Sequence, residues 1–334
     1  MFDLLKKIYT IAGKQSKRIT TMFICDMLKS IFEGFTLGGL GYFLLTLSRA
    51  VFQGQPVTNA HIITVFCIML VSLTGKIIFG YISDRNKNIA SYTMGAENRL
   101  VIGDKLKNVH MGYFSESRLG DISGALTTVI TDVETIDMMI LEMMFAGSIQ
   151  TVIMALFVFP FDMLTGCIIF VTLAVAIVFN NLFQKKTDAV TAKLTELKLQ
   201  LRTDILEYVQ GIGVVKAFGR TSEALKNVTE SIKKSKTGFF AVEKTLTPSL
   251  LVFSLLLKLG TTAIIVNALY RYSIGTIDIE KTLMLIVASF VVFGGFEIAG
   301  TMQRMRGVAV QNLDTLFKVK NIQALPEGSL RPHG

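Results

Sequence analysis

The chain has 334 residues, a formal net charge of +9 and 51% apolar residues, and its mean hydropathy is +0.53. Several windows of about 20 residues are almost free of charge, which is the length that crosses a bilayer. Of the 34 Lys and Arg residues, 28 lie in four segments that we assign to the cytoplasm and that hold 5, 6, 12 and 5 of them: 1–18, 82–133, 184–244 and 303–334. This positive-inside bias argues against nucleic acid as a partner and predicts a membrane protein with both termini in the cytoplasm.

The cysteines and histidines indicate neither a disulfide framework nor a metal site. Cys25, Cys67 and Cys167 lie singly in apolar segments, without a C-x-x-C pair. We therefore expect buried, inert thiols. No group of His, Cys and carboxylate residues has metal-ligand spacing, so no bound metal is expected in this chain.

Residues 1–18 predict a helix that lies on the membrane surface. Phe2, Leu5, Tyr9 and Ala12 fall on one helical face, and lysines flank that face. This pattern is typical of an interfacial helix whose lysines face the anionic headgroups of the inner leaflet. The alternative is an amphipathic helix that packs in the protein core.

The apolar segments predict an all-α protein with six membrane helices. Helices 4 and 6 keep a three-to-four spacing of apolar residues beyond the membrane, to about Ile205 and Val319, and helix 2 is expected to continue to about Asn108. We place the six membrane segments at about Thr20–Phe52, His61–Tyr81, Ile136–Phe159, from the tight turn at Asp162 to Phe183, Leu246–Tyr270 and Ile277–Gln303.

One short apolar stretch lies far from the membrane segments, between two long charged helices. Its two glycines, Gly211 and Gly213, are expected to interrupt the helix, because each lowers helix stability by about 1 kcal/mol relative to Ala. Ile212, Val215 and Phe218 have no lipid to enter at that distance. An apolar element held in this way predicts a plug for a groove on another protein.

Two stretches resemble the intracellular loops of one family. The pattern Glu-x-x-x-Gly-Ile-x-Val-Val-Lys-x-Phe over 207–218 resembles the second intracellular loop of ABC exporter transmembrane domains. Tyr-Phe-Ser-Glu-Ser-Arg-Leu-Gly-Asp-Ile over 113–122, followed by Asp-Val-Glu-Thr-Ile over 132–136, resembles the first. Thr221 stands where the family often has an acidic residue. With the hydropathy pattern, the resemblance covers essentially the whole chain.

The resemblance implies the six-helix (type IV) exporter fold over 19–323, with two coupling helices. It also implies a domain-swapped dimer in which helices 4 and 5 of each half pack with the partner. Residues 324–334 are expected to be a linker toward an ATP-binding domain that is missing from this chain. No G-x-x-x-x-G-K-[ST] phosphate loop occurs here, so we expect ATP and Mg²⁺ on that domain and no enzyme activity or cofactor in this chain. The residues expected to couple to that domain are Tyr113, Phe114, Arg118, Gly120, Gly211, Ile212, Val215, Lys216 and Phe218.

Charged residues inside the expected membrane helices have two interpretations. Each costs about 2.5–3.5 kcal/mol on insertion scales, so such residues usually face a partner or a cavity. They either pair with one another and stiffen the bundle, or they line a substrate path. Counting depth at about 1.5 Å per residue places Lys29 level with Glu297, and Glu33 level with Lys258. The residues concerned are Asp26, Lys29, Glu33, Glu142, Lys258 and Glu297.

Small residues in helices 1 and 6 also have two interpretations. Gly34-x-x-x-Gly38 and Gly295-x-x-x-Ala299 favour close packing between helices. Alternatively, Gly38-Gly39-x-Gly41 and Gly294-Gly295 are hinges for an outward opening movement.

The sequence thus predicts the transmembrane half of an ATP-driven ABC transporter. Its expected partners are membrane lipid, a second half that is identical or related, and an ATP-binding domain; its expected place is the bacterial inner membrane. One alternative is an ion-coupled secondary transporter, which would predict inverted repeats. Another is a membrane scaffold that transports nothing and needs no polar lining. The substrate and the direction of transport stay open.

Overall fold

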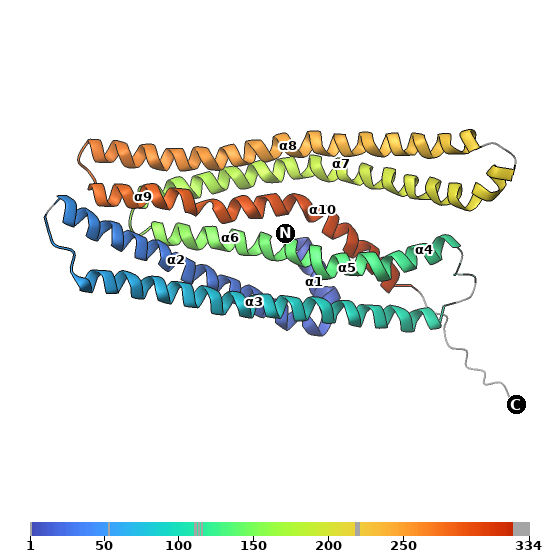
Figure 1. Ribbon diagram of the computed structural model, residues 1–334, viewed down its shortest axis with the longest axis horizontal. Helices are drawn as coiled ribbons and strands as arrows, with labels where there is room; N and C mark the ends of the chain where they lie inside the picture. The colour runs from blue at the N-terminus through green and yellow to red at the C-terminus, as the bar shows by residue number, and fades with distance from the viewer. Residues whose placement is uncertain are drawn as a thin grey trace, which may run out of the picture. The chain divides into compact units, whose positions relative to one another are not determined.

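The computed structural model describes residues 2–52, 54–109, 112, 114, 116–217 and 221–322, and this part of the chain contains no strand (Figure 1). The α-helices are α1 (Phe2–Ala12), α2 (Ser16–Phe52), α3 (Asn59–Lys107), α4 (Glu116–Gly124), α5 (Ile130–Asp132), α6 (Met138–Val158), α7 (Met163–Ala217), α8 (Thr221–Ser273), α9 (Ile279–Val292) and α10 (Gly294–Lys320). A 3₁₀ segment, η1 (Gly13–Gln15), and two π-helical segments, η3 (Ala125–Val129) and η4 (Val133–Asp137), join some of them. The prediction of an all-α protein is confirmed.

Six helical stretches are long and apolar enough to cross a membrane, as the sequence predicts. They are Leu4–Val51, Asn59–Lys107, Ile122–Val158, Met163–Val214, Lys226–Ser273 and Ile279–Lys320. The longest helices, α7 with 55 residues and α8 with 53, each extend over about 80 Å at 1.5 Å per residue. Since the hydrocarbon layer is about 30 Å thick, these helices must continue far beyond it.

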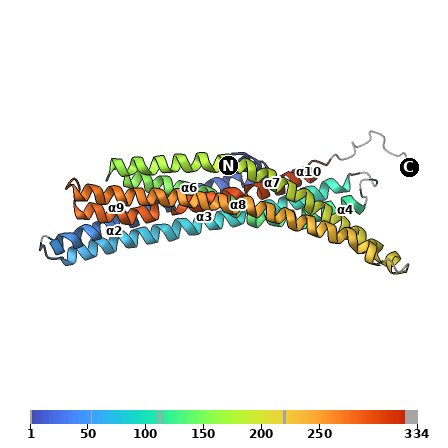
Figure 2. The same cartoon turned by 90° about the horizontal axis from the view of Figure 1, so that it is seen from above.

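The chain forms two compact units: Met1–Ile169 with Thr261–Gly334, and Phe170–Gly260. In the first unit, α2 packs along α3, and α6 packs along α10 (Figures 1 and 2). One hydrophobic core joins α1, α2, α3, α5, η4, α6 and α10 in this unit. Its fully buried side chains include Leu4, Ile8, Met22, Met94, Met138, Leu141 and Leu313.

The face that α3 buries consists mostly of small and polar residues, with Met94 and Ile102 as the large apolar exceptions. The small and polar residues include Ser72, Gly75, Ser83, Ala90 and Ser91. Large apolar side chains of the same helix, such as Ile62, Phe66 and Ile77, are exposed. This arrangement is the reverse of a soluble helix, and it is expected where lipid covers the outside and small residues let helices approach closely.

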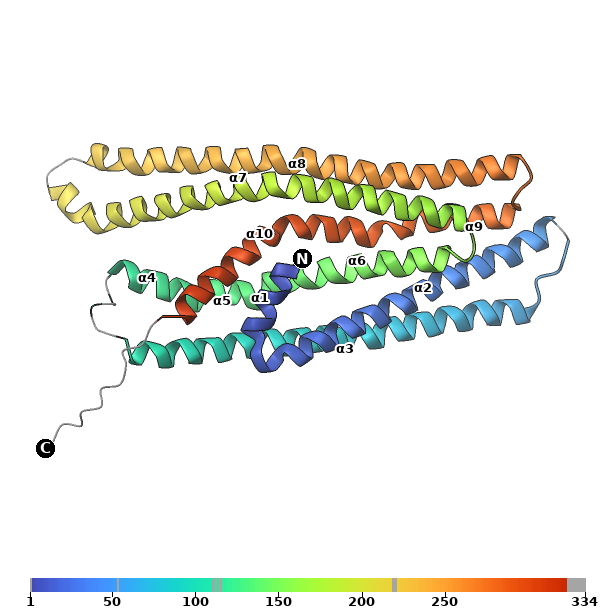
Figure 3. The same ribbon diagram turned by 180° about the vertical axis from the view of Figure 1, so that it is seen from behind.

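The buried face of helix α1 shares Ala12 with the face expected, and the side chain of Phe2 lies outside the described residues. Leu4, Ile8, Ile11 and Ala12 are at most 3% exposed and contact α3 and α10, whereas Leu5 and Tyr9 are only partly buried (Figure 3). One face of this helix therefore packs against neighbouring helices, and its position at the membrane surface stays a prediction.

The glycines of the membrane helices serve both packing and bending. A Cβ on Gly34 would lie 2.6 Å from the Phe157 ring, and a Cβ on Gly295 would lie 2.7 Å from the carbonyl oxygen of Gly147. Gly38 and Gly294 would meet nothing within 4 Å. The last predicted membrane helix is interrupted at Phe293, directly before Gly294, where α9 ends and α10 begins. Gly295 thus fits the packing interpretation, and Gly294 fits the hinge interpretation.

The second unit is an antiparallel pair formed by α7 and α8 (Figures 1 and 2). The expected interruption at Gly211 and Gly213 is wrong, because α7 is helical through both glycines to Ala217. Neither glycine has a positive φ, and the cost of about 1 kcal/mol for each is tolerated within so long a hydrogen-bonded helix. The last turns of α7 nevertheless change direction (Figure 1).

The three cysteines are free, but only Cys25 is buried as expected. Cys67 and Cys167 are exposed. They lie on helix faces that turn away from the neighbouring helices, so the expectation of burial is wrong for these two.

Candidate functional site

The polar residues of α2 predicted to lie in the membrane contact α3. Glu33 Oε1 accepts a hydrogen bond from Lys76 Nζ at 2.8 Å, and Asp26 Oδ1 lies 2.7 Å from the Ser83 hydroxyl oxygen. The structure thus pairs Glu33 with Lys76, which the depth count had not considered. A lysine inside the apolar part of α3 was the signal that could have found this pair.

A second ion pair joins α3 to α6. Lys87 Nζ donates to Glu142 Oε2 at 2.6 Å and to Asp84 Oδ1 at 2.8 Å. Glu142 and Glu33 therefore fit the interpretation that intramembrane charges stiffen the bundle. The pairing of Lys29 with Glu297 stays a prediction, and Lys258 lies in the second unit.

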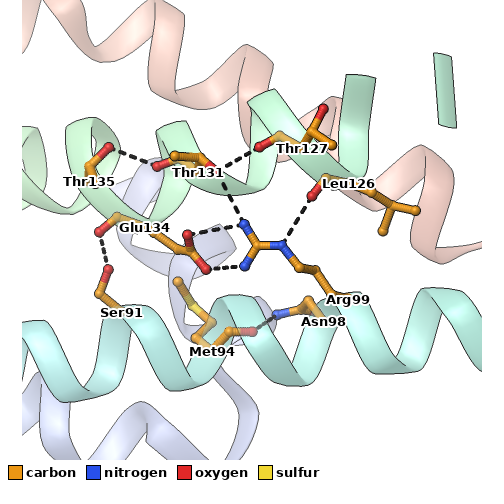
Figure 4. Close-up of polar contacts among 9 residues, drawn as sticks. All are labelled: Ser91, Met94, Asn98, Arg99, Leu126, Thr127, Thr131, Glu134 and Thr135. Carbon is orange, nitrogen blue, oxygen red and sulfur yellow. Dashed lines mark hydrogen bonds and ion pairs between the residues drawn. The ribbon is translucent and has the colours of Figure 1, made fainter. Parts of the chain in front are cut away.

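Arg99 of α3 holds the segment that follows the first predicted loop (Figure 4). Its Nη1 and Nη2 both donate to the Glu134 carboxylate, the latter at 3.2 Å, and its Nε donates to the Leu126 carbonyl at 3.1 Å. Nη2 also lies 3.2 Å from the Thr131 hydroxyl, and the Ser91 hydroxyl donates to the Glu134 carbonyl. Because these five residues come from α3 and from the stretch η3–α5–η4, their hydrogen bonds hold that stretch against α3.

Two features of the sequence make this contact possible. Gly95 lies one turn before Arg99 on α3, and a Cβ there would overlap Glu134 Oε1. The two π-helical segments η3 and η4 lie on either side of Thr131. Such wide turns occur frequently at functional sites, and here they flank residues that bind Arg99.

Asn98, the residue next to Arg99, connects α3 to the end of α10. Its Oδ1 accepts a hydrogen bond from Lys320 Nζ at 2.8 Å, and the Lys320 carbonyl oxygen accepts a hydrogen bond from Lys105 Nζ at 2.6 Å. Lys7 of α1 pairs with Asp314 of α10 at 2.7 Å. The last helix before residues 324–334 is therefore fastened to α3 and α1 at the point where α3 also holds Glu134.

The comparison with known families agrees with the six long apolar helices. The model of the family described as ABC transporter transmembrane region matches residues 21–296, more than four fifths of the chain. The chain belongs to this family. A search of curated proteins finds no match. As a member of this family, the chain is the membrane domain of a transport protein. Family membership also implies that it pairs with an ATP-binding domain and with a second membrane half.

In this ABC transporter membrane domain, the described residues expected to couple to the ATP-binding domain lie in or beside the short helix α4 and in the last turns of α7. Phe114 is half-buried, and Gly120 lies in α4 and is partly buried. Tyr113 and the side chain of Arg118 lie outside the described residues. The Arg99 contacts, which the motif comparison did not single out, hold the stretch directly after this loop.

The second expected loop forms the last turns of α7. Gly211 and Ile212 are partly buried there, and Lys216 is exposed. The side chain of Val215 and all of Phe218 lie outside the described residues. The roles of all these residues in coupling therefore stay predictions.

The ABC transporter membrane domain also has an ion cluster at the turn between α6 and α7, which sequence analysis missed. The Asp162 side chain is 4% exposed; its Oδ2 accepts from the backbone N–H of Thr165 at 3.0 Å and from its hydroxyl at 2.6 Å. Oδ1 faces Arg271 at 2.6 Å and Lys281 at 3.5 Å. Burial alone would raise the pKa of Asp162, but the bonds from Thr165 and Arg271 outweigh it and lower the pKa to about 2. An acid directly before a helix, with Thr three residues later, was the available signal.

No group of three His, Cys, Asp or Glu side chains suited to a metal ion occurs within the described ranges.

Proposed function

We propose that this membrane domain forms one half of the substrate path of an ATP-driven transporter. It pairs with a second half, identical or related, in the bacterial inner membrane. The ATP-binding domain that works with it holds ATP and Mg²⁺ and carries out hydrolysis, so this chain itself is not the enzyme. The observation that carries the proposal is the length of α3, α7 and α8, which exceed the thickness of the hydrocarbon layer by about 40–50 Å.

Long helices of this kind transmit movement when their ends are fastened. The first expected coupling loop continues into a segment that Arg99 clamps to α3 through Glu134. A displacement of that loop by another domain would therefore move α3, which packs along α2 over most of its length. The second expected loop presents exposed groups at the end of α7, including Val214, which is 63% exposed. Exposed apolar side chains without lipid usually mark contacts with another protein.

The intramembrane charges contribute to the path in different ways. Glu33 and Glu142 are already paired with lysines of α3. Their main role is therefore to hold α2, α3 and α6 together while the bundle changes shape. The second interpretation, that some charged residues of the membrane helices line the substrate path, is kept for Lys29, which is in none of the ion pairs described above between α2, α3 and α6.

Site-specific photocrosslinking in the complete transporter tests this proposal. A photoreactive amino acid at Leu119, which is 56% exposed on α4, or at Lys216 should become attached to the ATP-binding domain. The same amino acid at Ser273, beside the α8–α9 turn, is the control and should not be attached. Crosslinks from Ser273 but not from Leu119 and Lys216 would overturn the assignment of the coupling ends.

A further inference from the structure

Asp26 differs from the other acidic residues between α2, α3 and α6. Its side chain is 1% exposed, and within the described part of the chain no Lys or Arg nitrogen forms an ion pair with it. Glu33 and Glu142, in contrast, each have a lysine within 2.8 Å. The Oδ2 atom of Asp26 has no hydrogen-bond partner among the described residues. An ionised carboxylate in this position would leave a buried charge without compensation, which is costly.

The Ser83 hydroxyl provides an independent observation. Its oxygen lies 2.7 Å from Asp26 Oδ1 and 3.2 Å from the Met22 carbonyl oxygen. A hydroxyl has one hydrogen and can donate only one of these two bonds. If Oδ1 carries a proton, Asp26 donates to Ser83 and Ser83 donates to Met22. Both contacts are then hydrogen bonds, and 2.7 Å is a usual length for a bond between two oxygens.

The ion pairs near Asp26 in the described part of the chain join other residues and not Asp26 itself. Lys87 on α3 is shared between Asp84 and Glu142, and these two carboxylates repel a further negative charge. Lys29, one turn along α2, attracts the Asp26 carboxylate, but no ion pair joins the two side chains among the described residues, and Asp26 Oδ2 stays without a hydrogen-bond partner there. The titratable groups near Asp26 are Cys25 and Lys29 on α2, Asp84 and Lys87 on α3, and Glu142 on α6.

We propose that Asp26 is a proton-binding site, and that in this conformation it is a neutral carboxylic acid that donates to Ser83. Moving α2 away from α3 and α6 exposes the group to water, which takes the proton as hydronium and leaves the carboxylate. Returning to the packed conformation reverses this transfer. The part played in transport rests on the proposed function: a cycle that opens and closes this contact binds and releases one proton.

Infrared spectroscopy of the purified chain in detergent tests the protonation directly. A protonated carboxyl group has a C=O stretching band at higher frequency than a carboxylate. The difference spectrum between the unmodified chain and Asp26→Asn at neutral pH should contain such a band. Glu33→Gln is the matched control, because Glu33 is paired with Lys76 and its replacement should remove no band in this region. Superimposable spectra of the unmodified chain and Asp26→Asn would overturn the proposal.

A second variant keeps Asp26 in place. Ser83→Ala removes the acceptor for the Asp26 proton, so the band should remain and move to higher frequency. An unchanged band would mean that it does not come from Asp26, and the proposal would fail even if Asp26→Asn does not fold. Neither spectrum depends on ATP or transport. A failed crosslinking test with a positive infrared result would therefore contradict the proposed function alone.

Discussion

Asp162 and Arg271 join two turns that are far apart in the chain. Arg271 Nη1 lies 2.6 Å from Asp162 Oδ1, although the residues are 109 positions apart. The pair connects the start of α7 to the end of α8, and Lys281 of α9 approaches the same oxygen. One nearly buried carboxylate thus holds together the connections at one end of the first unit.

Replacing Asp162 by Asn should lower the stability of the chain by about 2 kcal/mol, because hydrogen bonds to a charged group are worth about 1.5–3 kcal/mol each. Thermal unfolding in detergent measures the loss. Glu230→Gln is the matched control: Glu230 pairs with Lys234, but both side chains are more than half exposed, so its loss should matter little. If the two substitutions lowered the stability equally, the burial of Asp162 would have no influence on how much its hydrogen bonds contribute.

The lowered pKa of Asp162 also predicts how the stability of the chain depends on pH. Its folded pKa is about 2, below the ordinary value of 3.8. The unfolded chain therefore takes up the proton first as the pH falls, and the contribution of Asp162 to stability is complete above about pH 4 and is lost toward pH 2. The difference in melting temperature between the unmodified chain and Asp162→Asn should shrink over this window. A difference that stays constant down to pH 2 would contradict the assignment.

The Arg99–Glu134 contact should behave as a coupled pair. Removing one partner, in Arg99→Met or Glu134→Gln, leaves the other group with unpaired hydrogen-bonding atoms and should cost about 1–3 kcal/mol. The double variant should cost less than the sum of the two, because neither charge is then left alone. Melting temperatures of the four proteins form the cycle. Strict additivity would mean that the two side chains do not interact in solution.

Two glycines should respond in opposite ways to replacement by Ala. In Gly95→Ala the new Cβ meets the carboxylate that Arg99 holds, so the contact must shift and stability should fall. In Gly211→Ala the Cβ meets nothing within 4 Å, and helix stability should rise by about 1 kcal/mol. Thermal unfolding of both variants decides this. A large loss of stability in Gly211→Ala would show that the end of α7 is not helical in solution.

The positive-inside pattern predicts which ends of the helices are accessible from outside. In a chain without its native cysteines, an impermeant thiol reagent added outside intact cells should modify cysteines placed at Gln55 and Ser273. It should not reach cysteines at Ser117 or Thr221 until the membrane is opened. Modification of Ser117→Cys in intact cells would contradict the six-helix arrangement with cytoplasmic loops.

Properties that depend on length and composition could be predicted from the sequence. An apolar window long enough to cross a bilayer must be helical, because lipid offers no hydrogen bonds to the backbone. The six membrane helices follow from this requirement and are present. The continuation of helices 4 and 6 beyond the membrane follows instead from the three-to-four spacing of apolar residues, and it is present in α7 and α10, as is that of helix 2 in α3. The two loop patterns also indicated the family, because each is a local stretch of sequence that can be read without knowing the fold.

The partner of each polar residue was decided only by the tertiary structure. Depth along a helix gives one coordinate, whereas an ion pair also depends on the rotation of both helices and on which helices are neighbours. Glu33 therefore has Lys76 as a partner, which the depth count alone did not indicate, and α1 buries Leu4 and Ile8. Gly211 is a second example. Its low helix propensity predicts a break in the helix, but the hydrogen bonds of a long helix keep it helical within α7. Contacts between residues far apart in the chain decide such cases, and propensity describes only one residue at a time.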